Sequence, residues 1–183
     1  MTAQTYPPEV WQRALRVRLL ILDVDGVLTN GSLYFGPREE VFKVFHVRDG
    51  HGIKMAQQGG VEVAFLSGRR SDAAFLRARE LGVSRYFEGL RDKAPVLEEL
   101  CRTLGLGFEE AATVGDELVD LPLFYRVGLA VAVADAVPEV KAAAHWVTIN
   151  PGGQGAVREV TDLILKARGV WEELVGIWGP PSK

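Results

Sequence analysis

The sequence has few of the features that mark secreted, membrane-spanning or nucleic-acid-binding proteins. It contains one cysteine, Cys101, so no intrachain disulfide can form, and a reducing compartment fits. Its longest apolar runs are far shorter than the roughly 20 residues that a membrane-spanning helix needs. MTAQTYPPEVWQR at the amino terminus lacks a basic segment followed by an apolar one, so we expect no signal peptide and a cytoplasmic location. The formal charge is -3 without a long basic run, which disfavours nucleic acid as a partner.

Short apolar runs alternate with amphipathic stretches along the 183 residues. The runs are Leu19–Leu22, Val61–Leu66, Ala111–Val114, Leu129–Val133 and Trp146–Ile149. Their near-continuous apolar character is typical of parallel strands that are covered on both faces. We therefore predict an α/β fold with a doubly wound, Rossmann-like parallel sheet over residues 19–168. An N-terminal segment (1–18) precedes this domain, and a C-terminal tail (169–183) follows it.

One segment departs from this alternation and reads as a β-hairpin, here called the flap hairpin (residues 32–47). Its turn falls at Gly36 and Pro37. Its second arm carries apolar side chains on both faces, namely Val41, Phe45 and Val47 on one and Phe42 and Val44 on the other. A hairpin that is apolar on both faces needs a cover, and we expect a neighbouring subunit to supply it.

Polar residues stand where the predicted strands end. Asp23 and Asp25 follow the first run, Ser67 follows the second and Asp116 follows the third, while Lys93 opens the helix between the last two. Because ligands of such sheets bind at the carboxyl ends of the strands, we expect these side chains to converge on one site.

This set of groups suits the hydrolysis of a phosphate monoester. A carboxylate attacks phosphorus only when a cation neutralises the charge, and Mg²⁺ does so with one or two protein carboxylates. Asp23 and Asp116 would supply those ligands, and Asp25 would exchange protons with the leaving group and with water. Ser67 would donate a hydrogen bond to a phosphoryl oxygen, and Lys93 would balance the buried negative charge.

Other readings of the aspartate pair explain less of the sequence. A calcium loop needs a third ligand where Val27 and Leu28 stand. A glycosyltransferase D-x-D motif leaves Ser67, Lys93 and Asp116 without a role. Two aspartates that only cap a helix or turn would be costly beside four buried apolar residues.

The sequence resembles the haloacid dehalogenase superfamily of phosphatases. DVDGVLT is similar to its first motif, Ser67 to its second, Lys93 to its third and GDELVD to its fourth. Further blocks resemble one family within it, the 3-deoxy-D-manno-octulosonate (Kdo) 8-phosphate phosphatases. They are DVDGVLTNG, FHVRDGHGIK, SGRRS, VGDELVDLP, VAVADAVPEV and GGQGAVREV, between Leu19 and Lys166.

The resemblance implies a role for each matching residue. Asp23 would be the nucleophile and a Mg²⁺ ligand, Asp25 the general acid and base with its carbonyl on the metal, and Asp116 the remaining protein ligand. The sugar acid would touch His46, Val47, Arg48, Asp49 and Gly50, possibly across a subunit boundary. Its charged ends and the bound phosphate would meet Asp25, Lys54, Arg69, Arg77 and Lys93. The family forms homotetramers through the flap hairpin. Glu117 stands where an aspartate is usual, and Gln154 where a basic residue is common.

The spacing of the motifs leaves no room for a cap domain between Asp25 and Ser67 or between Ser67 and Lys93. A site without a cap acts on large substrates or borrows a lid from a partner, and we expect a borrowed lid. The expected reaction is Mg²⁺-dependent release of phosphate from Kdo 8-phosphate, a step towards lipopolysaccharide, through an aspartyl-phosphate. The alternatives are a nine-carbon sialic-acid-type 9-phosphate substrate, a non-catalytic phosphatase-like module and a capless phosphatase of macromolecules.

Overall fold

The structure is a computed structural model that describes residues 6–37, 40–177 and 179. At its centre is a parallel six-stranded sheet in the order β5-β4-β1-β6-β7-β8. Its strands are β1 (Leu19–Leu22), β4 (Glu62–Leu66), β5 (Arg85–Phe87), β6 (Ala111–Gly115), β7 (Leu129–Ala132) and β8 (Trp146–Val147). The predicted α/β fold with a parallel, Rossmann-like sheet is confirmed.

Strand β1 lies between β4 and β6, and all four of its side chains are buried. The chain first adds strands on one side of β1 and then on the other, so β1 marks the point where the strand order reverses. In open α/β sheets this switch point leaves a crevice at the carboxyl ends of the strands, where ligands bind. The first predicted carboxylates, Asp23 and Asp25, come directly after β1.

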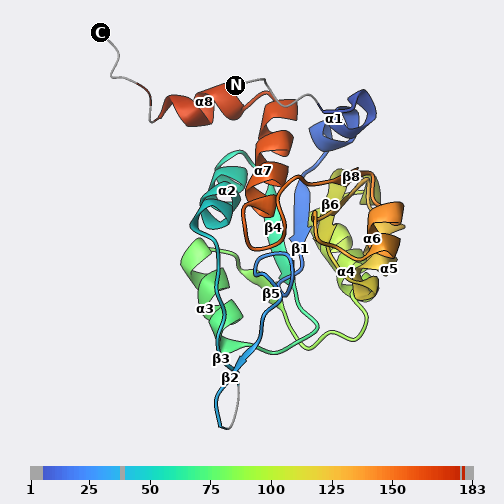
Figure 1. The fold of residues 1–183 in the computed structure, drawn as a ribbon. Helices are drawn as coiled ribbons and strands as arrows, with labels where there is room; N and C mark the ends of the chain where they lie inside the picture. Colours follow the sequence, from blue (N-terminus) through green and yellow to red (C-terminus); the bar gives the residue numbers. More distant parts are fainter. Residues whose placement is uncertain (1–5, 38–39, 178, 180–183) are drawn as a thin grey trace.

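Helices cover both faces of the sheet (Figure 1). They are α1 (Pro8–Leu15), α2 (Val47–Gln58), α3 (Asp72–Leu81), α4 (Ala94–Leu104), α5 (Leu121–Phe124), α6 (Pro138–Ala143), α7 (Ala156–Ala167) and α8 (Trp171–Gly176), with short 3-10 turns at Phe108–Glu110 and Leu118–Asp120. Helix α7 packs against α1 and α2, whereas α5 packs against α4 and α6. Right-handed crossovers account for this division, because they place helices on opposite faces once the strand order reverses.

The helix boundaries follow local signals in the sequence. Ser71 caps α3, since its hydroxyl accepts a hydrogen bond from the backbone N–H of Ala74 at 3.3 Å. Gly82 ends the same helix in the left-handed conformation, with φ 72°. The described parts of the segments outside residues 19–168 each contain one helix. Val10 and Ala14 of α1 are buried, and so is Leu174 of α8.

The flap hairpin is shorter than predicted. Its strands β2 (Tyr34–Phe35) and β3 (Glu40–Phe42) pair antiparallel, and the rings of Tyr34 and Phe42 stack 4.7 Å apart. Val47 is the first residue of α2, so its predicted place on the second arm of the hairpin is wrong. Two glycines hide the helical pattern of α2, because glycine is a poor helix former. One of them, Gly52, lets α2 approach α7 so closely that an added Cβ would lie 2.4 Å from Thr161 Oγ1.

Between β1 and β4 the described residues hold only the flap hairpin and α2, and between β4 and Lys93 only α3 and β5. The absence of a cap domain is therefore confirmed in the part of the chain that the structure describes. Among these same residues, no helix has both the length and the apolar character to cross a membrane.

Candidate active site

Two neighbouring strands bring the predicted acidic groups together. Asp23 follows β1 and Asp116 follows β6, the strand that pairs with β1. Carboxylate oxygens of Asp23, Asp116 and Asp120 all lie within 4.8 Å of one another. Carboxylates converge in this way because carboxyl ends of adjacent parallel strands meet at one edge of the sheet.

Lys93 lies within this aspartate cluster (Asp23, Asp116 and Asp120). Its ammonium donates hydrogen bonds to Asp23 and, at 2.6 Å, to Oδ1 of Asp120, and only 2% of its side chain is exposed. Burial alone would lower the pKa of Lys93, but the two carboxylates outweigh it and raise the pKa. The lysine is therefore charged and balances part of the negative charge.

One lysine does not neutralise three carboxylates. Burial raises the pKa of Asp23 to about 7, with Lys93 opposing the shift and Asp120 adding to it. Burial and the neighbouring Asp23 raise the pKa of Asp116 to about 8. The Oδ1 atom of Asp116 is buried and has no hydrogen-bond partner. A cluster of carboxylate oxygens with excess negative charge, one of them without a hydrogen-bond partner, fits a hard divalent cation such as Mg²⁺.

Backbone contacts fix the loop that carries Asp116. Oδ2 of Asp120 accepts hydrogen bonds from the backbone N–H groups of Asp116 at 3.0 Å and Glu117 at 3.4 Å. Gly26 has φ 93°, and a Cβ there would lie 2.0 Å from Asp116 Oδ2. Only glycine fits at position 26, because a side chain would be both strained and in collision with the aspartate.

The loop after β1 rests on a second glycine-rich loop that precedes α7. The backbone N–H of Gly153 donates to the carbonyl of Val27 at 2.9 Å. A Cβ on Gly152 would lie 1.7 Å from the carbonyl oxygen of Gly26. The two loops thus touch backbone to backbone, and neither has space for a side chain at these points.

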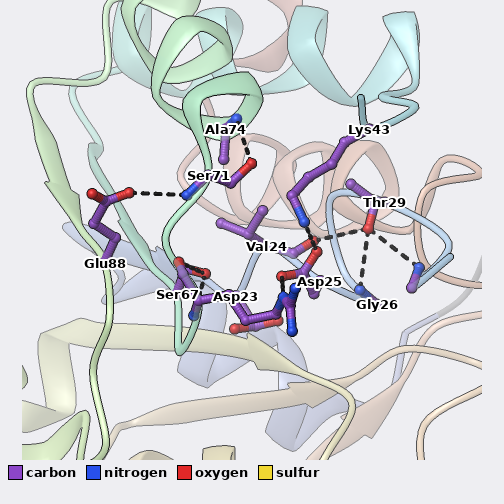
Figure 2. A network of polar contacts seen from close by, with 12 residues as sticks. Asp23, Val24, Asp25, Gly26, Thr29, Lys43, Ser67, Ser71, Ala74 and Glu88 are labelled. Atoms are coloured by element: carbon purple, nitrogen blue, oxygen red, sulfur yellow. Dashed lines mark hydrogen bonds and ion pairs between the residues drawn. The ribbon is translucent and has the colours of Figure 1, made fainter. Parts of the chain in front are cut away.

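Two cationic side chains flank the carboxylate of Asp25. Nζ of Lys43 lies 2.5 Å from Oδ1 of Asp25 (Figure 2). Nε of Arg69 lies 4.0 Å from Oδ2. Thr29 holds the backbone beneath this carboxylate. Its Oγ1 accepts from the N–H of Gly26 at 3.4 Å and donates to the carbonyl of Val24 at 3.4 Å. Asp25 is therefore held both at its side chain and at its backbone.

Ser67 is buried in the turn after β4, with 1% of its surface exposed. Its hydroxyl donates to the carbonyl of Arg69 at 2.9 Å and accepts from the N–H of Arg69 at 3.1 Å. The hydroxyl thus shapes the loop that presents Arg69 to Asp25. Its predicted hydrogen bond to a phosphoryl group stays a prediction.

The segment predicted to touch the sugar acid lies partly inside the fold. Asp49 is 1% exposed, and its carboxylate accepts from the N–H groups of Gly155 at 3.2 Å and Arg158 at 2.8 Å at the start of α7. Burial raises the pKa of Asp49 against these two hydrogen bonds. Gly50 is buried beside Arg77, whose guanidinium a Cβ would approach to 2.2 Å. Within one chain, Asp49 therefore ties α2 to α7.

The remaining predicted contacts come from α2 and α3. Val47 and Arg48 are exposed at the start of α2, and Lys54 is exposed further along it. Arg77 pairs with Glu80 at 2.7 Å. The contact of these residues with substrate stays a prediction.

Comparison with known proteins places this site in a family. Residues 87–159 match the haloacid dehalogenase-like hydrolases. The 3-deoxy-D-manno-octulosonate 8-phosphate phosphatase of Yersinia pestis is 46% identical over 169 residues, which cover 92% of this chain and 90% of that protein. The chain belongs to this phosphatase family of haloacid dehalogenase-like hydrolases. The resemblance seen in the sequence and the predicted enzyme class, a phosphoric monoester hydrolase, are confirmed.

Solved structures of relatives share the fold. A 3-deoxy-D-manno-octulosonate 8-phosphate phosphatase from Moraxella catarrhalis, in complex with magnesium, phosphate and Kdo, aligns with a TM-score of 0.91 at 34% identity and covers 94% of this chain and 99% of that one. The cobalt-bound enzyme from Haemophilus influenzae aligns with a TM-score of 0.84 at 43% identity and covers 86% and 92%. Both relatives therefore hold a divalent metal ion.

The sequence did not predict two of the contacts around Asp25, those of Lys43 and Thr29. Lys43 was read only as part of the flap hairpin, although it is the one charged residue in the run Val41–Phe45. Thr29 was read only as part of a matching motif. For Lys43 the available signal was its isolation among apolar residues, since a buried lysine needs a carboxylate partner.

Proposed function

We propose that this protein hydrolyses Kdo 8-phosphate to Kdo and inorganic phosphate in a Mg²⁺-dependent reaction. The observation that carries this proposal is the buried aspartate cluster, in which Asp116 Oδ1 has no partner and Lys93 bridges Asp23 and Asp120. The identity of 46% over nine-tenths of the chain to a named phosphatase of this substrate supports the choice of sugar. So does the Moraxella catarrhalis relative, which binds magnesium, phosphate and Kdo.

Asp23 and Asp116 would hold Mg²⁺ through their side chains, and Asp25 through its backbone carbonyl. The bound ion neutralises negative charge on the phosphate and on the attacking carboxylate. Lys93 contributes further positive charge beside Asp23 and fixes the orientation of that carboxylate.

The reaction divides between two aspartates. A carboxylate oxygen of Asp23 attacks phosphorus, and the bond from phosphorus to the sugar oxygen breaks while Asp25 gives that oxygen a proton. A water molecule then attacks the phosphorus of the aspartyl-phosphate and passes a proton to Asp25. This second step releases inorganic phosphate and restores both carboxyl groups to their starting states.

We further propose that the protein acts as a homotetramer in the cytoplasm. Apolar side chains of the flap hairpin support the assembly, because Phe35 is 64% exposed and Phe42 is 50% exposed in the single chain. A second copy would also bring side chains to an otherwise open site and so complete the contacts predicted for His46, Arg48, Lys54 and Arg77. Sedimentation velocity is expected to give four times the mass of one chain, and a monomer would contradict the assembly.

A panel of phosphate esters tests the proposed substrate. We expect phosphate release with Mg²⁺ to be fastest from Kdo 8-phosphate, slower from a nine-carbon sialic-acid-type 9-phosphate and slower still from a phosphopeptide. EDTA should remove the activity, and added Mg²⁺ should restore it. Faster release from the nine-carbon sugar phosphate would contradict Kdo 8-phosphate as the substrate but not the proposed phosphatase reaction. No release from any ester would contradict the proposed function itself.

A further inference from the structure

One side chain of the flap hairpin, that of Lys43, points towards Asp25 in the candidate active site. Lys43 lies immediately after β3, and its side chain is 1% exposed although Phe42 and Val44 on either side of it are half exposed. Nζ of Lys43 reaches Oδ1 of Asp25 at 2.5 Å (Figure 2). Burying an ammonium group is costly unless a carboxylate pairs with it, so this contact defines where the lysine points.

A second contact joins the flap hairpin to the same carboxylate. The guanidinium of Arg69, in the turn after β4, lies 5.9 Å from the centre of the Phe35 ring in β2. Nε of Arg69 is 4.0 Å from Oδ2 of Asp25. One oxygen of Asp25 is thus bound closely by Lys43, while the other faces a longer contact with a side chain that is 45% exposed.

This asymmetry matters for proton transfer. The terminal torsion of an aspartate is broad, so the side chain alone does not fix the direction of each oxygen. A group that delivers a proton must point its oxygen at the acceptor within hydrogen-bond reach. Because Lys43 holds Oδ1, the oxygen left to face the crevice is Oδ2.

We propose that Lys43 is a positioning residue that acts through Asp25. It orients the carboxyl group so that Oδ2 gives a proton to the leaving sugar oxygen and later takes one from water. This inference rests on the proposed function, since it assigns Lys43 to the acid–base half of that reaction. The flap hairpin is accordingly part of the catalytic machinery of its own chain, besides any part in assembly.

The test compares two esters that differ in their need for a proton. A sugar alkoxide leaves only when protonated, whereas p-nitrophenolate leaves without help. In Lys43→Met we expect single-turnover cleavage of the sugar phosphate to slow by about 10- to 100-fold, a loss typical of misplaced catalytic groups. Cleavage of p-nitrophenyl phosphate should slow by less than about threefold, because that step bypasses the acid. Lys43→Arg, which keeps the charge, should recover part of the lost rate.

A cycle with Asp25→Asn tests whether the lysine acts through this aspartate. The residual single-turnover rate of Asp25→Asn on the sugar phosphate should be the same with and without Lys43→Met, since the group that Lys43 positions is already gone. Lys141→Met, on α6, is the control for loss of a lysine. It should leave both esters unaffected.

Two results would overturn the inference. Equal slowing of both esters in Lys43→Met would show that the lysine only supports the flap hairpin, and an unchanged rate with the sugar phosphate would show no role. Both results can be interpreted only when the wild-type enzyme is active. Failure of the proposed function appears separately, as a wild-type protein that cleaves neither ester.

Discussion

Asp23→Asn is expected to abolish phosphatase activity, with kcat reduced by at least about 10⁴-fold, as for other lost nucleophiles. The amide has the same shape and still accepts a hydrogen bond from Lys93, but it does not attack phosphorus. The fold should survive. Burial raises the pKa of Asp23 to about 7, so the native site works against an ionised carboxylate there, and a neutral amide relieves that cost.

Phosphate release measured with Mg²⁺ and urea unfolding measured without metal, both at pH 8 on one preparation, check both parts of this prediction. Asp72→Asn, at an exposed position in the first turn of α3, is the matched control and should retain full activity. Turnover by Asp23→Asn at more than a hundredth of the wild-type rate would remove Asp23 as the nucleophile. Loss of folding would instead point to a structural need for its charge.

Lys93→Met is expected to have the largest effect on stability. The lysine bonds to Asp23 and Asp120, and both of its partners are nearly fully buried. Removing one side of a buried ion pair costs about 3–5 kcal/mol in the free energy of unfolding, because the charges left behind have neither water nor a partner. Urea denaturation at pH 8 should show this loss, and phosphatase activity should fall with it.

Two further variants separate charge from packing. Lys93→Met with Asp120→Asn leaves one unpaired carboxylate fewer and should recover part of the lost stability. Arg85→Met breaks a partly exposed pair with Glu62 at 2.8 Å and should cost less than about 1 kcal/mol. A Lys93→Met protein as stable as wild type would mean that the ammonium contributes nothing net to the cluster.

The defect of Lys93→Met should depend on pH. The pKa of Asp23 is already raised above its unfolded value of 3.8, and loss of the lysine raises it further. A folded carboxyl group with a raised pKa binds protons more readily than the unfolded chain does, so stability falls as pH rises between the two values. The difference between variant and wild type should therefore shrink as pH falls from 8 towards 5.

Local signals made much of the fold predictable. Apolar runs such as Leu19–Leu22 suit strands because a parallel strand that is covered on both faces buries every residue of a short run. Ser71 and Gly82 bound a helix through contacts with their own neighbours. The strand-end positions of Asp23 and Asp116 follow from the same pattern. Convergence at one edge is a property of parallel sheets, so spacing along the chain was enough to predict that these aspartates meet.

Contacts between distant segments were not predictable in this way. Asp49 was assigned to the substrate by resemblance, yet its carboxylate binds backbone N–H groups at the start of α7, about a hundred residues further along the chain. The partner of Lys43 depends on how the flap hairpin folds back over the end of β1. The alternation of apolar residues does not predict the orientation of the hairpin relative to that strand. Val47 alternated like a strand residue, but packing of α2 on α7 places it in a helix.

The backbone contact between the loop after β1 and the glycines before α7 bears on how the chain is made. Asp23, the proposed nucleophile, is synthesised early because β1 is the first strand to emerge, whereas Gly152 and Gly153 leave the ribosomal exit tunnel only after β8. A nascent chain therefore carries Asp23 and Asp25 long before the loop after β1 has the support of Gly152 and Gly153. We therefore expect the proposed site to be completed near the end of synthesis, and a chain cut short before α7 to keep Asp23 and Asp25 without the backbone that supports their loop.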